Sequence, residues 1–277
     1  MTDQSNAPLN PVHRVLFTAG QEKQASYKSV LASAGYAVNC IPLLKITAAE
    51  VLPDIQQKIL QTDYAGIVFT STNAVKYTFS VLPPEFTQKL TRGSIAVFCV
   101  GKRTASACVG YGISKTYTPD KPAGRERIMS IPEFTALSGN RILYPCGDLA
   151  DGQSFITDLH RLNITADALT VYSNIMPAGA DKAVSEYWKK CPPDAVILMS
   201  PSAVSRLYHS LNLTGTELKK NGLLSAGRVS DVKTVQTRFI LSGATTEKAF
   251  IHFFPSYAPI IVPYPSPEGI CKALSAH

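Results

Sequence analysis

Short apolar runs alternate with helix-like stretches along almost the whole sequence, and this alternation limits the possible folds more than any other feature. The runs contain about four to six apolar residues, many of them Val or Ile, and are bounded by Gly, Ser or Pro. Examples are VLFTAG (15–20), YAGIVFTS (64–71), ILYPCG (142–147) and DAVILMS (194–200). Such runs are typical of parallel strands that are covered on both faces. The sequence therefore predicts an α/β protein with doubly wound parallel sheets.

Two kinds of strand unit recur in alternation. The first is strand, Gly turn, helix and strand, beginning at 15–20 and again at 142–147. The second pairs a strand that ends in hydroxyl residues with one that ends in Gly. It is seen in IVFTSTNAV with VFCVGKRTASA (67–75 and 97–107) and in VILMSPSAV with FILSGATTEKA (196–204 and 239–249). Taken alone, this order predicts a tandem duplication with a boundary near residue 140.

The hydroxyl residues stand where ligands bind in open α/β sheets, beyond the carboxyl ends of the strands. A Ser, Thr or Asn there caps the following helix, and the free backbone N–H groups and the helix dipole favour an anion. Capping explains any one of these turns, but matching turns in two pairs favour a shared anion-binding cleft. The residues are Ser71, Thr72, Asn73, Thr104, Ser200, Ser202, Thr245 and Thr246.

Charge and composition exclude several classes of function. The net charge of +7 permits an anionic partner. The basic residues are spread out and do not alternate with aromatic ones, so nucleic acid is the last-ranked candidate partner. A small polyanion is equally compatible with the positive net charge. The cysteines form no CxxC pair and the histidines no HxH or HxxxH pair, which argues against a metal site and against structural zinc.

No apolar run approaches the roughly 20 residues that a membrane-spanning helix needs. The N-terminal MTDQSNAPLNPVHR is polar and lacks the apolar core of a signal peptide. We therefore expect no membrane association and a cytoplasmic location.

A series of stretches, taken in order from about residue 14 to residue 274, resembles the uroporphyrinogen-III synthase family. They are IVFTSTNAV, VGKRTASA, ILYPCGD, ALTVYSN, DAVILMSPSAV, LSGATTEKA and VPYPSPEGI. The resemblance implies two α/β domains, each with a flavodoxin-like doubly wound parallel sheet, joined by a two-stranded linker. It implies that residues 1–43 and 175–277 form one discontinuous domain and residues 46–172 the other, in place of a tandem arrangement.

The resemblance also implies an activity. The family consists of lyases of tetrapyrrole and haem biosynthesis that cyclise hydroxymethylbilane to uroporphyrinogen III, with loss of water and inversion of ring D. It implies a monomeric enzyme without a cofactor, whose partner is this small tetrapyrrole and neither nucleic acid nor a membrane. Tyr172 is the expected catalytic residue, a donor that helps the hydroxyl leave. The positions expected to bind substrate are Thr70, Ser71, Gly101, Lys102, Thr104, Cys146, Gly147, Ser200, Ser202, Thr245 and Thr246.

Each of these assignments has a plainer alternative. Tyr172 ends an apolar strand, where a tyrosine is commonly half-buried. Lys102 and Arg103 resemble a solvated basic pair, and Cys146 resembles a packed small residue. The link over 211–238 is longer than is usual in the family and predicts a surface loop. A two-lobed small-anion-binding protein without catalysis is the alternative function.

Overall fold

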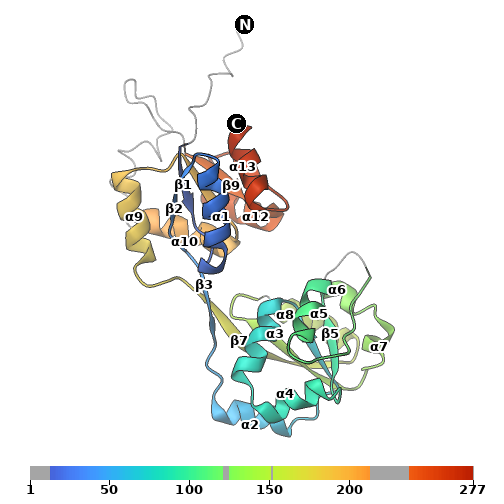
Figure 1. Ribbon diagram of the computed structural model, residues 1–277. Coiled ribbons are helices and arrows are strands. Elements are labelled where there is room, and N and C mark those ends of the chain that lie inside the picture. The colour runs from blue at the N-terminus through green and yellow to red at the C-terminus, as the bar shows by residue number, and fades with distance from the viewer. Residues whose placement is uncertain (1–12, 121–124, 151, 213–236, 277) are drawn as a thin grey trace, which may run out of the picture. The chain divides into compact units, whose positions relative to one another are not determined.

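The computed structural model describes residues 13–120, 125–150, 152–212 and 237–276. The chain divides into two compact units. The discontinuous unit consists of Met1–Lys45 and Ile175–His277, and the inserted unit consists of Ile46–Asn174. Each unit has its own five-stranded sheet (Figure 1). The long link predicted over 211–238 falls, apart from its two ends, outside the described residues.

The discontinuous unit draws its strands and helices from both ends of the chain. Its strands lie in the order β10-β9-β8-β1-β2, and the pairs β1–β2, β1–β8, β8–β9 and β9–β10 are parallel. Because β1 pairs with β8, a tandem arrangement is wrong for this chain. The elements are β1 (Arg14–Phe17), α1 (Gln21–Ser33), β2 (Ala37–Cys40), α9 (Ala180–Lys190), β8 (Ala195–Leu198), α10 (Pro201–Asn212), β9 (Arg238–Leu241), α12 (Gly243–Phe253), β10 (Ile260–Ile261) and α13 (Pro267–Ser275).

The apolar runs of this unit supply both faces of its sheet. Leu16, Val196 and Phe239 pack with helices α9, α10 and α12 on one face. Their neighbours along the strands, such as Val15 and Ile197, pack with α1 and α13 on the other. Successive side chains of a strand point to opposite faces, so a strand covered on both sides must be apolar at every position. This is why the runs lack an apolar-polar alternation.

The inserted unit repeats the same layered plan. Its strand order is β3-β7-β6-β4-β5, and the pairs β4–β5, β4–β6 and β6–β7 are parallel. That β3 and β7, neighbours in this sheet, act as a two-stranded linker remains a prediction. The elements are β3 (Lys45–Ala48), α2 (Pro53–Gln61), β4 (Gly66–Phe69), α3 (Thr72–Val81), α4 (Pro84–Thr91), β5 (Ala96–Cys99), α5 (Lys102–Val109), α6 (Arg125–Ile128), α7 (Pro132–Thr135), β6 (Arg141–Gly147), α8 (Gly152–Arg161) and β7 (Thr165–Ile175).

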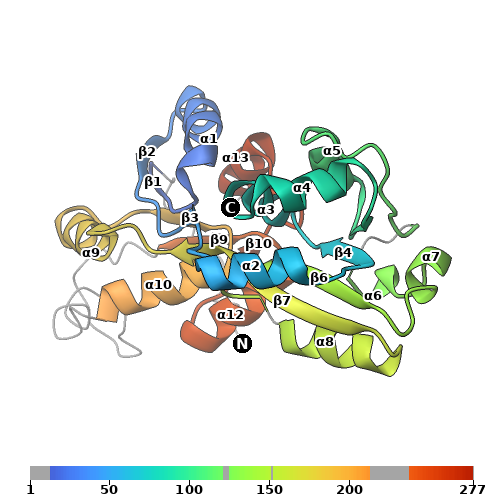
Figure 2. The same cartoon turned by 90° about the horizontal axis from the view of Figure 1, so that it is seen from below.

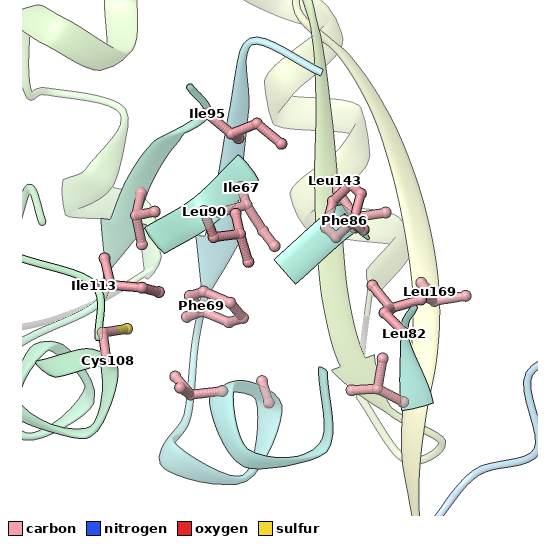
Figure 3. Packing of buried hydrophobic residues seen from close by; sticks show 14 of the residues in the cluster. Ile67, Phe69, Leu82, Phe86, Leu90, Ile95, Cys108, Ile113, Leu143 and Leu169 are labelled. Carbon is pink, nitrogen blue, oxygen red and sulfur yellow. The ribbon is translucent and has the colours of Figure 1, made fainter. Parts of the chain in front are cut away.

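Two apolar clusters cover the faces of this sheet. The α3-side cluster joins strand residues such as Ile67, Phe69 and Leu143 to α3, α4 and α5, and Figure 3 shows these side chains gathered with Phe86 and Leu90 of α4. The α8-side cluster joins the alternate strand residues to α6, α7 and α8. In Figure 2, α3, α4 and α5 lie on one side of β4, β6 and β7, and α8 lies on the other. The predicted α/β class with two doubly wound parallel sheets is confirmed.

None of the helices in the described parts of the chain combines the length and the apolar character needed to cross a bilayer.

Candidate functional site

The carboxyl ends of parallel strands meet at one edge of each sheet, and ligands of such sheets bind where the strand order reverses. In the inserted unit this point lies between β4 and β6, and in the discontinuous unit between β1 and β8. The residues expected from the sequence lie at these two edges. In the inserted unit they are Thr70, Ser71, Gly101, Lys102, Thr104, Cys146, Gly147 and Tyr172, and in the discontinuous unit Ser200, Ser202, Thr245 and Thr246.

Tyr172 is the centre of the group in the inserted unit. It is paired across the sheet with Gly147, the last residue of β6. Its hydroxyl lies 3.4 Å from Oγ of Ser71, which follows β4. Its ring lies 5.7 Å from the ring of Tyr77, centroid to centroid. Three neighbours thus restrain the ring and its hydroxyl, and the residue as a whole is half-buried.

One helix N-terminus lies against this phenol, and a second lies further along the same edge of the sheet. Ser71 caps α3, since its Oγ accepts a hydrogen bond of 3.0 Å from the amide of Ala74. Gly101 stands at the N-cap of α5, where no side chain caps the helix. Lys102 and Arg103, in the first turn of α5, are exposed. Because α3 and α5 follow the neighbouring strands β4 and β5, their N-terminal N–H groups and these two cations favour an anion at the same edge.

The edge of the discontinuous unit carries a second group of hydroxyls. Oγ of Ser200 accepts a hydrogen bond of 3.2 Å from the amide of Ala203 and lies 3.1 Å from Oγ of Ser202. This arrangement satisfies the first turn of α10 in the manner of an N-cap. Ser200 and Ser202 therefore lie together, as their spacing in SPSAV indicates.

The second hydroxyl turn of this unit differs from the sequence interpretation. The residue at the N-cap of α12 is Ser242, and Thr245 and Thr246 lie inside the helix. Thr245 is exposed, whereas Thr246 is buried with its Oγ1 3.5 Å from Oγ of Ser242. Sequence reasoning missed Ser242, which directly follows β9 and precedes Gly243, the first residue of α12, with a φ of +73°.

Two further expected residues are buried. Cys146 is buried in the α8-side cluster, the face of the sheet opposite to Tyr172. Burial raises the pKa of the Cys146 thiol, so it stays protonated at neutral pH. Thr104 is buried within α5. Any contact of these two residues with a ligand at the edge would involve the backbone.

The described part of the chain contains no cluster of three or more His, Cys, Asp or Glu residues that could hold a metal ion.

Comparisons with known proteins concern the family and the fold of this chain. A protein-family model described as uroporphyrinogen-III synthase HemD matches residues 25–230, well over half of the chain. No curated protein matches the sequence. A mutant uroporphyrinogen III synthase from the extremely thermophilic bacterium Thermus thermophilus superimposes with a TM-score of 0.60 at 13% identity, over 96% of this chain and 100% of that one. The enzyme from Helicobacter pylori gives 0.57 at 16% identity, over 95% and 98%. Identities this low establish a shared fold.

Proposed function

The chain belongs to the uroporphyrinogen-III synthase family, the cyclising hydro-lyases of haem biosynthesis, and we propose that residues at the carboxyl edges of its two sheets carry out the family's reaction. In that reaction hydroxymethylbilane, a linear tetrapyrrole with two carboxylates on every ring, loses water and closes to uroporphyrinogen III with ring D inverted. The observation that best supports the proposal is the half-buried phenol of Tyr172, held beside Ser71 and Gly147 where the strand order reverses.

The carboxylates of the substrate would bind at the helix N-termini. In the inserted unit the donors are the first turns of α3 and α5, with Thr70, Ser71, Gly101 and Thr104 contributing hydroxyls or backbone amides and Lys102 contributing charge. In the discontinuous unit the donors are the first turns of α10 and α12, with Ser200, Ser202, Thr245 and Thr246. Many weak donors suit this substrate because its charge is spread over all four rings.

Tyr172 would act on the leaving hydroxyl. The pyrrole nitrogen supplies the electron pair that expels the hydroxyl, the phenol donates a hydrogen bond or a proton to the departing oxygen, and the pyrrole N–H proton is released as the azafulvene forms. Ser71 supports this role, because its Oγ already accepts from the amide of Ala74. Its own hydrogen is then available to the phenol oxygen, which leaves the phenol hydrogen for the substrate.

The reaction itself is tested by product analysis. The purified protein, with no metal or cofactor added, is expected to convert fresh hydroxymethylbilane mainly to the type III isomer. The porphyrin isomers are separated after oxidation and compared with a protein-free control, in which the bilane closes without inversion. A product no richer in type III than this control would contradict the proposal and would favour the alternative of an anion-binding protein without catalysis, which the family match does not support.

We also propose where the protein acts, its oligomeric state and its partners. The protein is expected to act in the cytoplasm as a monomer, with the tetrapyrrole as its partner and without nucleic acid. Light scattering after gel filtration tests the monomer, and retention on DNA at varied salt tests the absence of nucleic-acid binding.

A further inference from the structure

The pairing of β6 with β7 is irregular next to Tyr172. From Arg141 opposite Thr165 to Cys146 opposite Thr170, the two strands advance together residue by residue. Gly147 is then opposite Tyr172 instead of Val171. One residue of β7 is therefore extra, which is the definition of a β-bulge.

The bulge determines the face of the sheet to which Tyr172 belongs. Leu169 and Val171 both pack in the α3-side cluster, as residues two apart in a strand should. In a regular strand Tyr172 would then point to the opposite face, with Thr170. Tyr172 instead packs against the same α3-side cluster. The extra residue thus brings two consecutive side chains of β7 to the face that carries Ser71 and α3.

Gly147 leaves the space that the ring of Tyr172 needs. Along β6, Leu143 packs in the α3-side cluster, and the alternate residues Tyr144 and Cys146 pack in the α8-side cluster. A side chain at position 147 would point to the α3 side by the same alternation. A Cβ added there would lie 2.5 Å from Cε2, 2.6 Å from Cζ and 3.0 Å from the hydroxyl of Tyr172.

Conformational freedom does not explain a glycine at position 147. Its φ lies outside the left-handed region, unlike that of Gly139 or Gly179. What this position requires is the absence of a side chain, because the ring of Tyr172 fills the space that a Cβ would occupy.

Tyr77 limits the ring of Tyr172 from another side. The two ring planes are inclined by 32°. Tyr77 is itself fixed, since it is buried in α3 and its hydroxyl donates a hydrogen bond of 3.0 Å to the carbonyl of Ile46. Bulge, glycine and second ring together leave the phenol of Tyr172 at 3.4 Å from Ser71.

We propose that Gly147 and Tyr77 are positioning residues for the reaction, which hold the phenol of Tyr172 against the leaving hydroxyl of the substrate. This inference rests on the proposed function and deepens it. It differs from the sequence interpretation, in which Gly147 binds substrate and Tyr77 has no part. A residue that acts only through Tyr172 loses its effect on turnover once the phenol is removed, which gives a decisive test.

The test is a double-mutant cycle between Gly147→Ala and Tyr172→Phe. In the wild-type background, Gly147→Ala displaces the ring and is expected to lower kcat about tenfold, with KM changed less than about threefold. In the Tyr172→Phe background, the ring still collides with the new methyl group, so Tm falls by a similar amount. No phenol remains to be misplaced, and kcat should then change less than about twofold.

Two matched controls accompany the cycle. Gly152, at the start of α8, leaves room for a methyl group, since among the described residues an added Cβ would contact the ring of Tyr144 alone, at 3.6 Å. Gly152→Ala is expected to keep kcat. Tyr77→Leu removes the second ring and is expected to lower kcat, whereas Tyr77→Phe keeps the ring and is expected to restore most of it. This pair also tests the proposal if Gly147→Ala fails to fold.

The position of the ring is read independently of turnover by ¹⁹F NMR of 3-fluorotyrosine at position 172, whose resonance should move in Gly147→Ala and stay in Gly152→Ala. An unmoved resonance, an unchanged kcat in Gly147→Ala, or an equal loss of kcat in both backgrounds would each overturn the inference. An inactive wild type would instead overturn the proposed function, and a fully active Tyr172→Phe would overturn the role of the phenol on which the inference depends.

Discussion

At the edge of the inserted unit, Tyr172 is half-buried, and its hydroxyl lies 3.4 Å from Oγ of Ser71. Thr104 and Cys146 are buried, and Lys102 is exposed in the first turn of α5. Oγ of Ser71 already accepts a hydrogen bond from the amide of Ala74 in the first turn of α3. We therefore expect the phenol of Tyr172 to supply a proton or a strong hydrogen bond to the leaving oxygen.

Tyr172→Phe keeps the ring and its packing and deletes the hydroxyl. We expect the rate of type III formation to fall roughly 10- to 100-fold, the lower part of the range for general-acid help, because the substrate's hydroxyl already leaves easily from an electron-rich pyrrole. Initial rates of wild type and variant are compared, and matched melting curves serve as the control for folding. A rate within about twofold of wild type would mean that Tyr172 only packs and that backbone donors act at the leaving group.

At the scale of elements, one carboxylate ties β1 to β8 at their amino ends. Asp194 accepts hydrogen bonds from the Arg14 side chain at 2.9 and 3.3 Å and from the amides of Arg14 and His13. Burial would raise the pKa of Asp194, but the hydrogen bonds from the Arg14 side chain and from these amides outweigh it, and the pKa is lowered. The first strand of the chain is thus joined to β8, its neighbour in the sheet, by a charged contact.

Asp194→Asn tests this contact through pH. Because the folded pKa is below the unfolded value of about 3.9, the contact stabilises the protein above that pH, and the stabilisation is lost as pH falls through the folded pKa. We expect the variant to be less stable at pH 7 by about 1 to 3 kcal/mol, and the difference to shrink between about pH 5 and pH 2.

Urea unfolding followed by the fluorescence of Trp188 is a suitable measurement, because this sole tryptophan is buried in the same unit. Glu186→Gln is the control. Glu186 forms only an exposed pair with Lys182 at 3.8 Å, and such pairs contribute little. Stability curves of wild type and Asp194→Asn that stay parallel through acid pH would contradict the assignment.

At the scale of the whole molecule, the two units differ in whether one continuous segment of the chain or two separate segments form them. The inserted unit takes its sheet and both apolar clusters from one continuous stretch. The discontinuous unit needs both ends, because β1 is an interior strand of its sheet, between β2 and β8. A fragment that spans the inserted unit therefore contains a complete core. A fragment that contains only one of the two segments of the discontinuous unit does not.

A fragment of residues 45–175 is therefore expected to fold alone, with a cooperative thermal transition and dispersed amide resonances. A fragment of residues 176–277 is expected to remain largely unfolded by the same measurements. Its control is a mixture with a peptide of residues 1–45, which supplies β1 and β2 and should restore structure. An unfolded 45–175 fragment would show that this unit depends on the rest of the chain.

The sequence predicts the layers of this molecule better than its details. Strands such as 15–17 and 195–198 can be recognised because burial on both faces demands an unbroken apolar run. Ser71 and Ser200 can be recognised as caps, since they directly follow such runs. Ser242 was missed because two threonines follow it and attract the same interpretation, although both lie inside the helix.

The bulge at Val171 could not be predicted from the sequence. A shift of one residue between β6 and β7 leaves no mark in ALTVYSN, which reads as an ordinary strand. The pairing that reveals it joins residues 25 positions apart. For the same reason Gly147 could be recognised as unusual, but the ring that occupies the space of a side chain at this position could not be identified. In the sequence, Tyr77 looks like an ordinary core residue of a helix.

The interrupted course of the discontinuous unit has a consequence for how the protein is made. Strand β1 leaves the ribosome early, but its neighbour β8 and the strand beyond it, β9, follow only about 200 residues later. At roughly 5 to 20 residues per second, β1 waits some 10 to 40 seconds for them. During this time the inserted unit is complete, while Val15, Leu16 and Phe17 have α1 and β2 but lack β8 and the helices that follow it. A nascent chain in this state is a natural client for a chaperone that binds short apolar segments.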